Sequence, residues 1–153
     1  PGKGRLLLTG QLGSGMKEAA QTALSFARAY AVKHNVEEDL IKTDIHIHVP
    51  SGAIKKDGPS AGIAITTALV SMLLHKQVRK EVCMTGEVTL RGKVLEIGGI
   101  KEKVLAAHRA GLKKVLLPLE NKKDMEDIPK SVKKDMKFEF VKTMDEVLKS
   151  ALI

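Results

Sequence analysis

The sequence predicts a mixed α/β fold in one compact domain, and three observations lead to this fold class. The chain has 153 residues, which suits a single domain with a buried core. Hydrophobic residues make up 43% and charged residues 29%, a balance typical of globular proteins. Short strand-like segments alternate with segments of helical period, without repeats or linkers. We therefore expect one domain over residues 1–153.

The first half of the chain predicts strands at 5–9 and 44–49 and helices at 16–33 and 59–74. The strand DIHIHV alternates strictly, so that Asp44, His46 and His48 share its polar face. The helix from Pro59 follows a loop, SGAIKKDG. This helix is apolar nearly all round, which is typical of a central, buried helix.

The second half predicts further strands at 82–85, 114–117 and 138–142, a hairpin of 88–90 with 94–97, and a helix at 100–110. Gly111 is expected just beyond the end of that helix, where a left-handed residue is common. Thr143 with Glu146 forms a capping-box pattern for a last helix. We expect some of the strands to pair locally.

Composition excludes several classes of protein. The apolar stretches are too short to span a bilayer, and no signal peptide is expected. The single Cys83 excludes an internal disulfide and fits a reducing compartment. The net charge is +8, but the basic residues are dispersed and aromatic residues make up 3%. We therefore expect a lysine-rich solvated surface, with weak nucleic-acid contact at most.

Ser60, in KDGPSAG, is a candidate nucleophile because it lies where a helix begins. Asp57 or Gly58 is placed to cap this helix, and Pro59 suits its first turn. Unpaired N–H groups at a helix start favour negative charge, which suits an oxyanion. The alternative is that Ser60 is only a good early-helix residue.

A serine needs a base, and histidine is one option. His34 and His75 are expected to be exposed near helix ends, whereas His46 and His48 share a strand face. A triad of Ser60, a histidine and Asp44 or Asp57 is conceivable, although no spacing selects it. No cysteine or further histidine lies at ligand spacing, so we expect no metal.

Lysine is the other option. In GGIKEKVLAAHRAG, Lys103 falls on the helical arc of Ile100 and three alanines at 106, 107 and 110. Lys101 falls towards the edge of that arc. Burial at a helix start would lower a lysine pKa towards that of a base. The alternative is a surface lysine with a snorkelling side chain.

Several segments, in order over nearly the whole chain, closely resemble the proteolytic domain of the Lon family of ATP-dependent proteases. They are TGQLG (9–13), DIHIHVP (44–50), KDGPSAG (56–62), MTGEVTLRG (84–92), IGGIKEKVLAAHRAG (97–111) and LLPLENKKDMEDIP (116–129). The form GPSAG resembles the soluble type rather than the membrane-anchored archaeal type.

The resemblance implies a serine endopeptidase with a Ser–Lys dyad and no catalytic histidine. Its serine matches Ser60, and its lysine matches Lys103, the second lysine of GGIKEK. Thr85 matches a hydroxyl that helps to hold the amine. The other implied supporting residues are Asp57, Gly58, Pro59, Ala61, His46 and His48. The chain departs from the family pattern at Ser14-Gly15 and at Ser51.

The resemblance also implies a larger protein, in which an ATPase module in cis threads unfolded or damaged proteins and short-lived regulators into a hexameric ring. Such a protein serves protein quality control and the stress response, in a bacterial cytoplasm rather than a mitochondrial matrix. GQLGSGMKE lacks the GK[ST] ending of a P-loop, so ATP and Mg²⁺ are expected only in that module, with no cofactor in this chain. Two alternatives stay open: a non-catalytic module that binds anions or RNA, and a Ser–His–Asp hydrolase.

Overall fold

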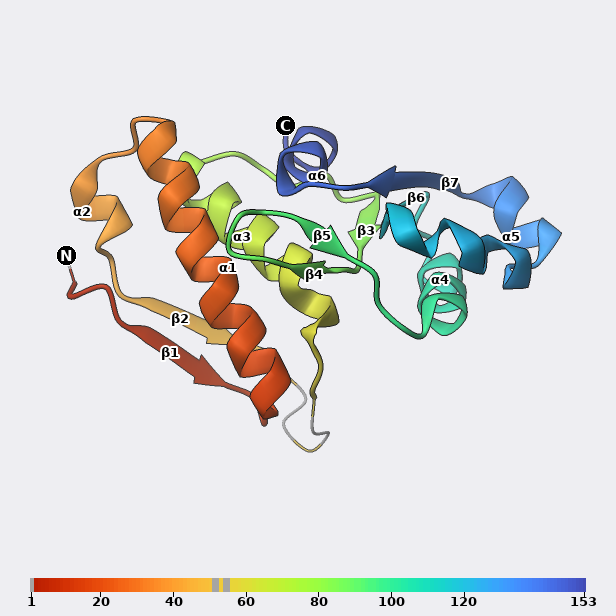
Figure 1. Ribbon diagram of the computed structural model, residues 1–153, viewed down its shortest axis with the longest axis horizontal. Helices are drawn as coiled ribbons and strands as arrows, with labels where there is room; N and C mark the ends of the chain where they lie inside the picture. The colour runs from red at the N-terminus through yellow and green to blue at the C-terminus, as the bar shows by residue number, and fades with distance from the viewer. Residues whose placement is uncertain (1, 51–52, 54–55) are drawn as a thin grey trace.

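Helices α1 (Ser14–Lys33) and α3 (Gly62–Leu74) pack against each other at the centre of the N-terminal half. The computed structural model describes residues 2–50, 53 and 56–153 (Figure 1). Along α1, buried alanines such as Ala20, Ala23 and Ala27 let α3 approach closely. The face of α3 that includes Ile63 and Val70 fills the space opposite, as its apolar sequence predicts.

Strands β1 (Leu6–Thr9) and β2 (Ile45–His48) form a two-stranded parallel sheet beside α1 (Figure 1). In β2, Ile45 is buried while His46 and His48 are exposed, which confirms the predicted alternation. The crossover between these strands contains α1 and a short helix α2 (Glu38–Ile41) that the sequence analysis did not predict. No described helix is long and apolar enough to cross a membrane.

A three-stranded parallel sheet organises the C-terminal half, with β6 (Lys114–Pro118) between β3 (Val82–Met84) and β7 (Lys137–Val141). Side chains of β6 alternate between two apolar clusters. Leu116 joins the first cluster, with α1, α3 and α6 (Met144–Ala151). Leu117 joins the second, with α4 (Ile100–Arg109) and α5 (Lys130–Asp135). Both leucines are fully buried, so β6 is the strand that the two clusters share.

The expectation that some strands pair locally is confirmed by one hairpin. Strands β4 (Glu87–Val88) and β5 (Val94–Leu95) pair antiparallel, and Gly92 adopts a φ of 84° in the turn between them. The remaining described strands pair in parallel across long stretches of sequence. Parallel pairing needs a crossover connection, so a tight turn does not join these strands.

The predicted helix ends are confirmed where the residue type requires a particular geometry. Gly111 follows α4 with a φ of 78°, and the Thr143 hydroxyl accepts the N–H of Glu146 at 3.3 Å. In contrast, α5 and the 3₁₀ segment η2 (Leu119–Asp127) were not predicted. Both lie in a highly charged stretch, which shows no helical apolar period.

Candidate active site

Ser60 lies in a short 3₁₀ helix, η1 (Pro59–Ala61), that runs directly into α3. Gly58 precedes η1 with a φ of 105°, a conformation that favours glycine, and it contributes no side-chain cap. The Ser60 carbonyl accepts two hydrogen bonds, from the Gly86 N–H at 2.9 Å and from the Thr85 hydroxyl at 3.2 Å. The turn after β3 therefore holds the start of this helix, with Ser60 half-buried.

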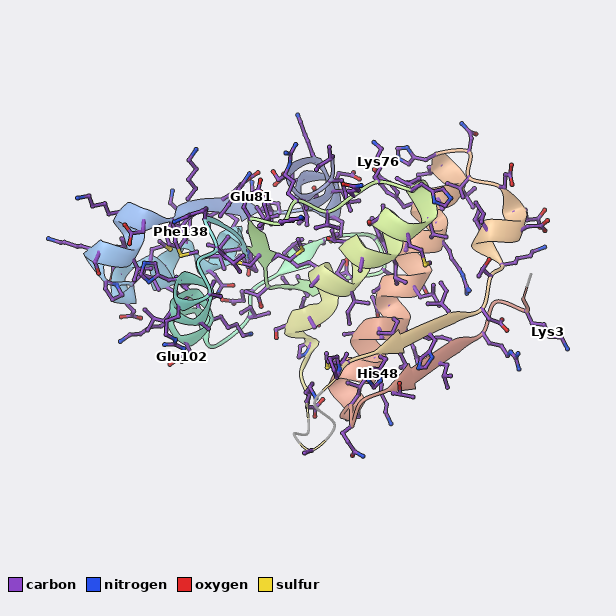
Figure 2. All side chains as sticks on the ribbon, turned by 180° about the vertical axis from the view of Figure 1, so that it is seen from behind. Lys3, His48, Lys76, Glu81, Glu102 and Phe138 are labelled. Atoms are coloured by element: carbon purple, nitrogen blue, oxygen red, sulfur yellow. The ribbon has the colours of Figure 1, made fainter. Side chains whose placement is uncertain are left out.

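Lys103 lies in the first turn of α4 and is half-buried, whereas Lys101 and Glu102 are exposed. Figure 2 shows Glu102 on the outer side of this helix. The inward direction expected for Lys103 is therefore observed, but the predicted arc is partly wrong. The buried stripe consists of Ile100, Val104 and Ala107, while the other two alanines of the arc, at 106 and 110, are exposed.

The buried Thr85 joins the two halves of the site. Its Oγ1 accepts a hydrogen bond from the Lys103 Nζ at 3.4 Å and donates one to the Ser60 carbonyl at 3.2 Å. The Thr85 N–H donates to the carbonyl of Leu116 on the central strand β6 at 3.3 Å. One hydroxyl thus connects the lysine amine of α4 to the backbone at the start of α3.

Ser60, Thr85 and Lys103 line one cavity of about 300 Å³. Its apolar walls come from four elements and include Ala64, Met84, Val104, Ala107, Val115 and Leu117. The sequence analysis did not identify these walls. A partial signal was available, because Ala64 lies one helical turn beyond Ser60 on α3. The cavity gives the serine and the lysine a common, largely apolar space.

Burial lowers the pKa of Lys103 below the ordinary value for a lysine, because the ammonium form is poorly solvated there. Within the described residues, no carboxylate forms an ion pair with this side chain. Among the described residues that line the cavity, the other ionisable side chain is Cys83, whose pKa is raised by burial. A lysine in this setting needs less free energy to become neutral, as a general base must.

The structure does not bring the histidines to Ser60. The Thr9 hydroxyl contacts the Nε2 of His46 and the Nδ1 of His48, each at 2.8 Å, on the exposed face of the β1–β2 sheet. Figure 2 shows His48 on this sheet, in the other half of the molecule from α4. No histidine is among the described residues that line the cavity.

The two candidate aspartates of a triad also have other roles. Asp44 accepts hydrogen bonds from the backbone N–H of Arg5, from the Arg5 side chain and from the Lys3 N–H. Together they lower the pKa of Asp44 to about 2, and the Arg5 N–H contributes most. The Asp57 carboxylate accepts the N–H of Gly58 and, at 3.2 Å, that of Met16 in the first turn of α1. Sequence analysis did not anticipate this contact between segments far apart in the chain.

Ser14 and Gly15, two of the positions that depart from the family pattern, do not line the cavity. Ser14 begins α1, and a Cβ added at Gly15 would lie 3.0 Å from the Asp57 carboxylate. Ser51 lies outside the described residues, as does part of the loop at 51–58. Across the described part of the chain, no group of three or more metal-ligating side chains comes together.

The full length of the chain, residues 1–153, matches the family of Lon protease (S16) C-terminal proteolytic domains. The chain belongs to this family. Lon protease of Dictyoglomus thermophilum is 60% identical over 153 residues, and that of Desulfosudis oleivorans is 61% identical over 152 residues. Lon protease 1 of Myxococcus xanthus is 53% identical over 154 residues.

Each of these matches covers 99–100% of this Lon proteolytic domain but 19% of the relative. The chain therefore spans about a fifth of the length of the curated relatives it matches. Within that fifth lies the whole cavity formed by Ser60, Thr85 and Lys103.

Proposed function

We propose that this chain is a serine endopeptidase domain in which Ser60 is the nucleophile and Lys103 the general base. One observation carries the proposal: the Lys103 amine, in the cavity that Ser60 also lines, is bound to a hydroxyl that holds the Ser60 backbone. The lowered pKa of Lys103 favours the same assignment. Membership of a proteolytic domain family sets the reaction class.

In the proposed reaction, neutral Lys103 accepts the Ser60 proton as Oγ attacks a peptide carbonyl. The N–H groups at the start of η1 and α3 would stabilise the tetrahedral oxyanion, since a helix start favours negative charge. The protonated Lys103 then donates to the leaving amine. In the second half, Lys103 accepts a proton from water as that water attacks the acyl-enzyme. It then returns this proton to the departing Ser60 Oγ, which releases the acid, free Ser60 and neutral Lys103.

The setting of this reaction is part of the proposal, because the matched relatives are about five times longer. We place the chain as the peptidase part of an ATP-dependent protease that degrades unfolded, damaged and short-lived proteins. An ATPase module in cis would supply ATP and Mg²⁺ binding, and the whole would assemble as a hexameric ring in a bacterial cytoplasm. Sedimentation of the 153-residue chain at high concentration tests whether this segment contributes to assembly.

The proposal is tested by cleavage of a fluorogenic peptide and of an unfolded protein without ATP, from pH 6 to pH 10. The unchanged chain is compared with Ser60→Ala, Lys103→Ala and His46→Ala. We expect loss of activity of about 10²-fold or more in the first two variants and little change in the third. Labelling of Ser60 by a peptide boronate provides a readout that needs no turnover.

Equal activity in the unchanged chain and in Ser60→Ala would refute the proposed nucleophile. Loss of activity in His46→Ala, with a pH limb near 6–7, would favour a histidine base instead. Absence of boronate labelling in a folded, hexameric preparation would favour the remaining alternative, a module that binds anions or RNA. That alternative predicts salt-dependent binding of RNA without hydrolysis.

Replacement of Thr85 by valine tests the bridge between the two halves of the site. Valine keeps the shape but removes the hydroxyl that binds both Lys103 Nζ and the Ser60 carbonyl. We expect kcat to fall about 10-fold to 100-fold, because a general base held less firmly loses much of its effect. Thermal unfolding should change little, since Gly86 still donates to the Ser60 carbonyl.

The matched control is Thr66→Val. Thr66 is also a buried threonine and donates its hydroxyl proton to the Gly62 carbonyl at 2.7 Å, but it does not line the cavity. Its kcat should stay within about twofold of the unchanged chain. Similar losses of kcat in both variants would show that Thr85 acts only through general stability.

A further inference from the structure

Asn121 is a fully buried amide in a run of charged residues on η2, with 1% of its surface exposed. Its Oδ1 accepts the Ile97 N–H at 3.0 Å, and its Nδ2 donates to the Ile97 carbonyl at 2.8 Å. The same Nδ2 donates to the Asp124 carboxylate at 2.8 Å. The side chain therefore pairs with both backbone groups of Ile97, as a neighbouring strand would.

Ile97 is the last residue before a glycine pair, Gly98-Gly99, that leads into α4. A Cβ added at Gly98 would meet no atom within 4 Å, so no neighbouring group packs against that side of this residue. Gly99 has a φ of 72°, which is accessible to glycine at little cost. The pair does not fix the position of α4 by itself, whereas Asn121 fixes the residue just before it.

Two contacts connect this loop to Lys103. The Lys103 N–H donates to the Gly99 carbonyl at 3.2 Å, so the loop forms part of the first turn of α4. A Cβ added at Gly99 would lie 3.9 Å from the Lys103 Cε, so the lysine side chain passes over the same loop on its way to the cavity. A shift of the loop would therefore move both the backbone and the amine of Lys103.

We propose that Asn121 is a positioning residue for Lys103, acting through Ile97 and the Gly98-Gly99 pair. The buried residues of α4, such as Val104, hold one face of the helix against the second apolar cluster. Apolar packing is non-directional, so it fixes the distance of α4 from the core more firmly than the position of α4 along its own axis. The paired amide of Asn121 is directional and fixes the start of α4, where a shift of about 1 Å matters for proton transfer.

Asn121→Leu tests this role, because leucine keeps a similar volume and removes all three hydrogen bonds. The control is Lys123→Leu on the same segment, which breaks the exposed ion pair of Lys123 with Glu96 but leaves the Ile97 backbone paired. The first readout is the pKa of Lys103, from competitive acetylation by acetic anhydride against pH with detection by mass spectrometry. The second is kcat and KM for a fluorogenic peptide, with thermal unfolding measured in parallel.

In Asn121→Leu we expect the pKa of Lys103 to rise towards the ordinary value, as the amine leaves its desolvated position. The acid limb of activity should move to higher pH, and kcat should fall at least about tenfold with KM within about twofold. Lys123→Leu should leave the pKa of Lys103, the acid limb, kcat and KM unchanged. If Asn121→Leu does not fold, Asn121→Ala removes the same three hydrogen bonds without adding bulk or charge.

The proposal would be overturned if a folded Asn121 variant kept the Lys103 pKa of the unchanged chain and lost activity only in proportion to the fraction of the variant that is unfolded. The role of Lys103 as a base rests on the proposed function, but the acetylation readout does not. If the unchanged chain cleaves no peptide and Asn121→Leu still raises the pKa, the positioning role stands while the peptidase proposal fails. If peptide cleavage depends on Lys103 but Asn121→Leu changes neither the Lys103 pKa nor kcat, the peptidase proposal stands while the positioning role fails.

Discussion

Lys103→Arg will abolish peptide hydrolysis as completely as Lys103→Ala, with a loss of about 10²-fold to 10⁴-fold. Arginine keeps the positive charge and can still donate to Thr85, so a purely electrostatic or structural lysine would tolerate the change. A guanidinium group stays protonated at every accessible pH and cannot accept the Ser60 proton. The measurement is kcat/KM for a fluorogenic peptide, and activity of Lys103→Arg near that of the unchanged chain would contradict the proposed base.

The pH dependence provides a second check on Lys103. In the proposed mechanism activity requires the neutral amine, so activity should rise with pH through the lowered pKa of Lys103, below the pH at which an ordinary lysine titrates. Between these two pKa values the unfolded chain binds more protons, so stability also rises with pH there. Lys103→Met should remove both effects without loss of stability, because it removes a poorly solvated ammonium. A pH profile of unfolding that is unchanged in Lys103→Met would argue against this burial effect.

Leu116→Ala will lower the free energy of unfolding by about 2–5 kcal/mol. Leu116 is fully buried on the central strand β6, where α1, α3 and α6 meet the sheet. Truncation removes apolar contacts and leaves a cavity that the surrounding helices cannot close without moving. Urea or thermal unfolding followed by circular dichroism measures the change.

The matched control is Leu90→Ala, at a residue that is 65% exposed, where the change should stay within about 0.5 kcal/mol. Leu117→Ala, one residue further along β6, should destabilise to a similar degree and also enlarge the cavity beside Ser60. Equal stability of Leu116→Ala and Leu90→Ala would contradict the place of β6 between the two clusters.

The elements that the sequence predicted well carry a strong local signal. The strand of His46 and His48 alternates strictly, and the α1 helix has a clear apolar stripe. The helix end at Gly111 depends on a residue type that suits one backbone conformation. The η2 and α5 segments offer no such signal, because charged residues dominate them and tertiary contacts decide their structure.

The candidate site was predictable to a similar extent. Local sequence made Ser60 and Lys103 candidates and the family resemblance selected them, and the structure places both at one cavity. Part of the cavity wall comes from β3 and β6, which pair in parallel over a long separation that periodicity does not reveal. Asn121 offered no signal at all, since a buried asparagine within LENKKDMED resembles its exposed neighbours.

The division of the core into two clusters has a consequence for biosynthesis. Ser60 precedes Lys103 in the chain, and the adjoining α3 packs in a cluster that also contains residues of the later β6 and α6. Lys103 reaches its place only when α4 docks on β6, and β6 itself pairs with the later strand β7. A serine without its base is a poor nucleophile. A nascent chain with the proposed chemistry therefore stays inert on the ribosome until nearly all of it has emerged, which protects its own unfolded segments from premature cleavage.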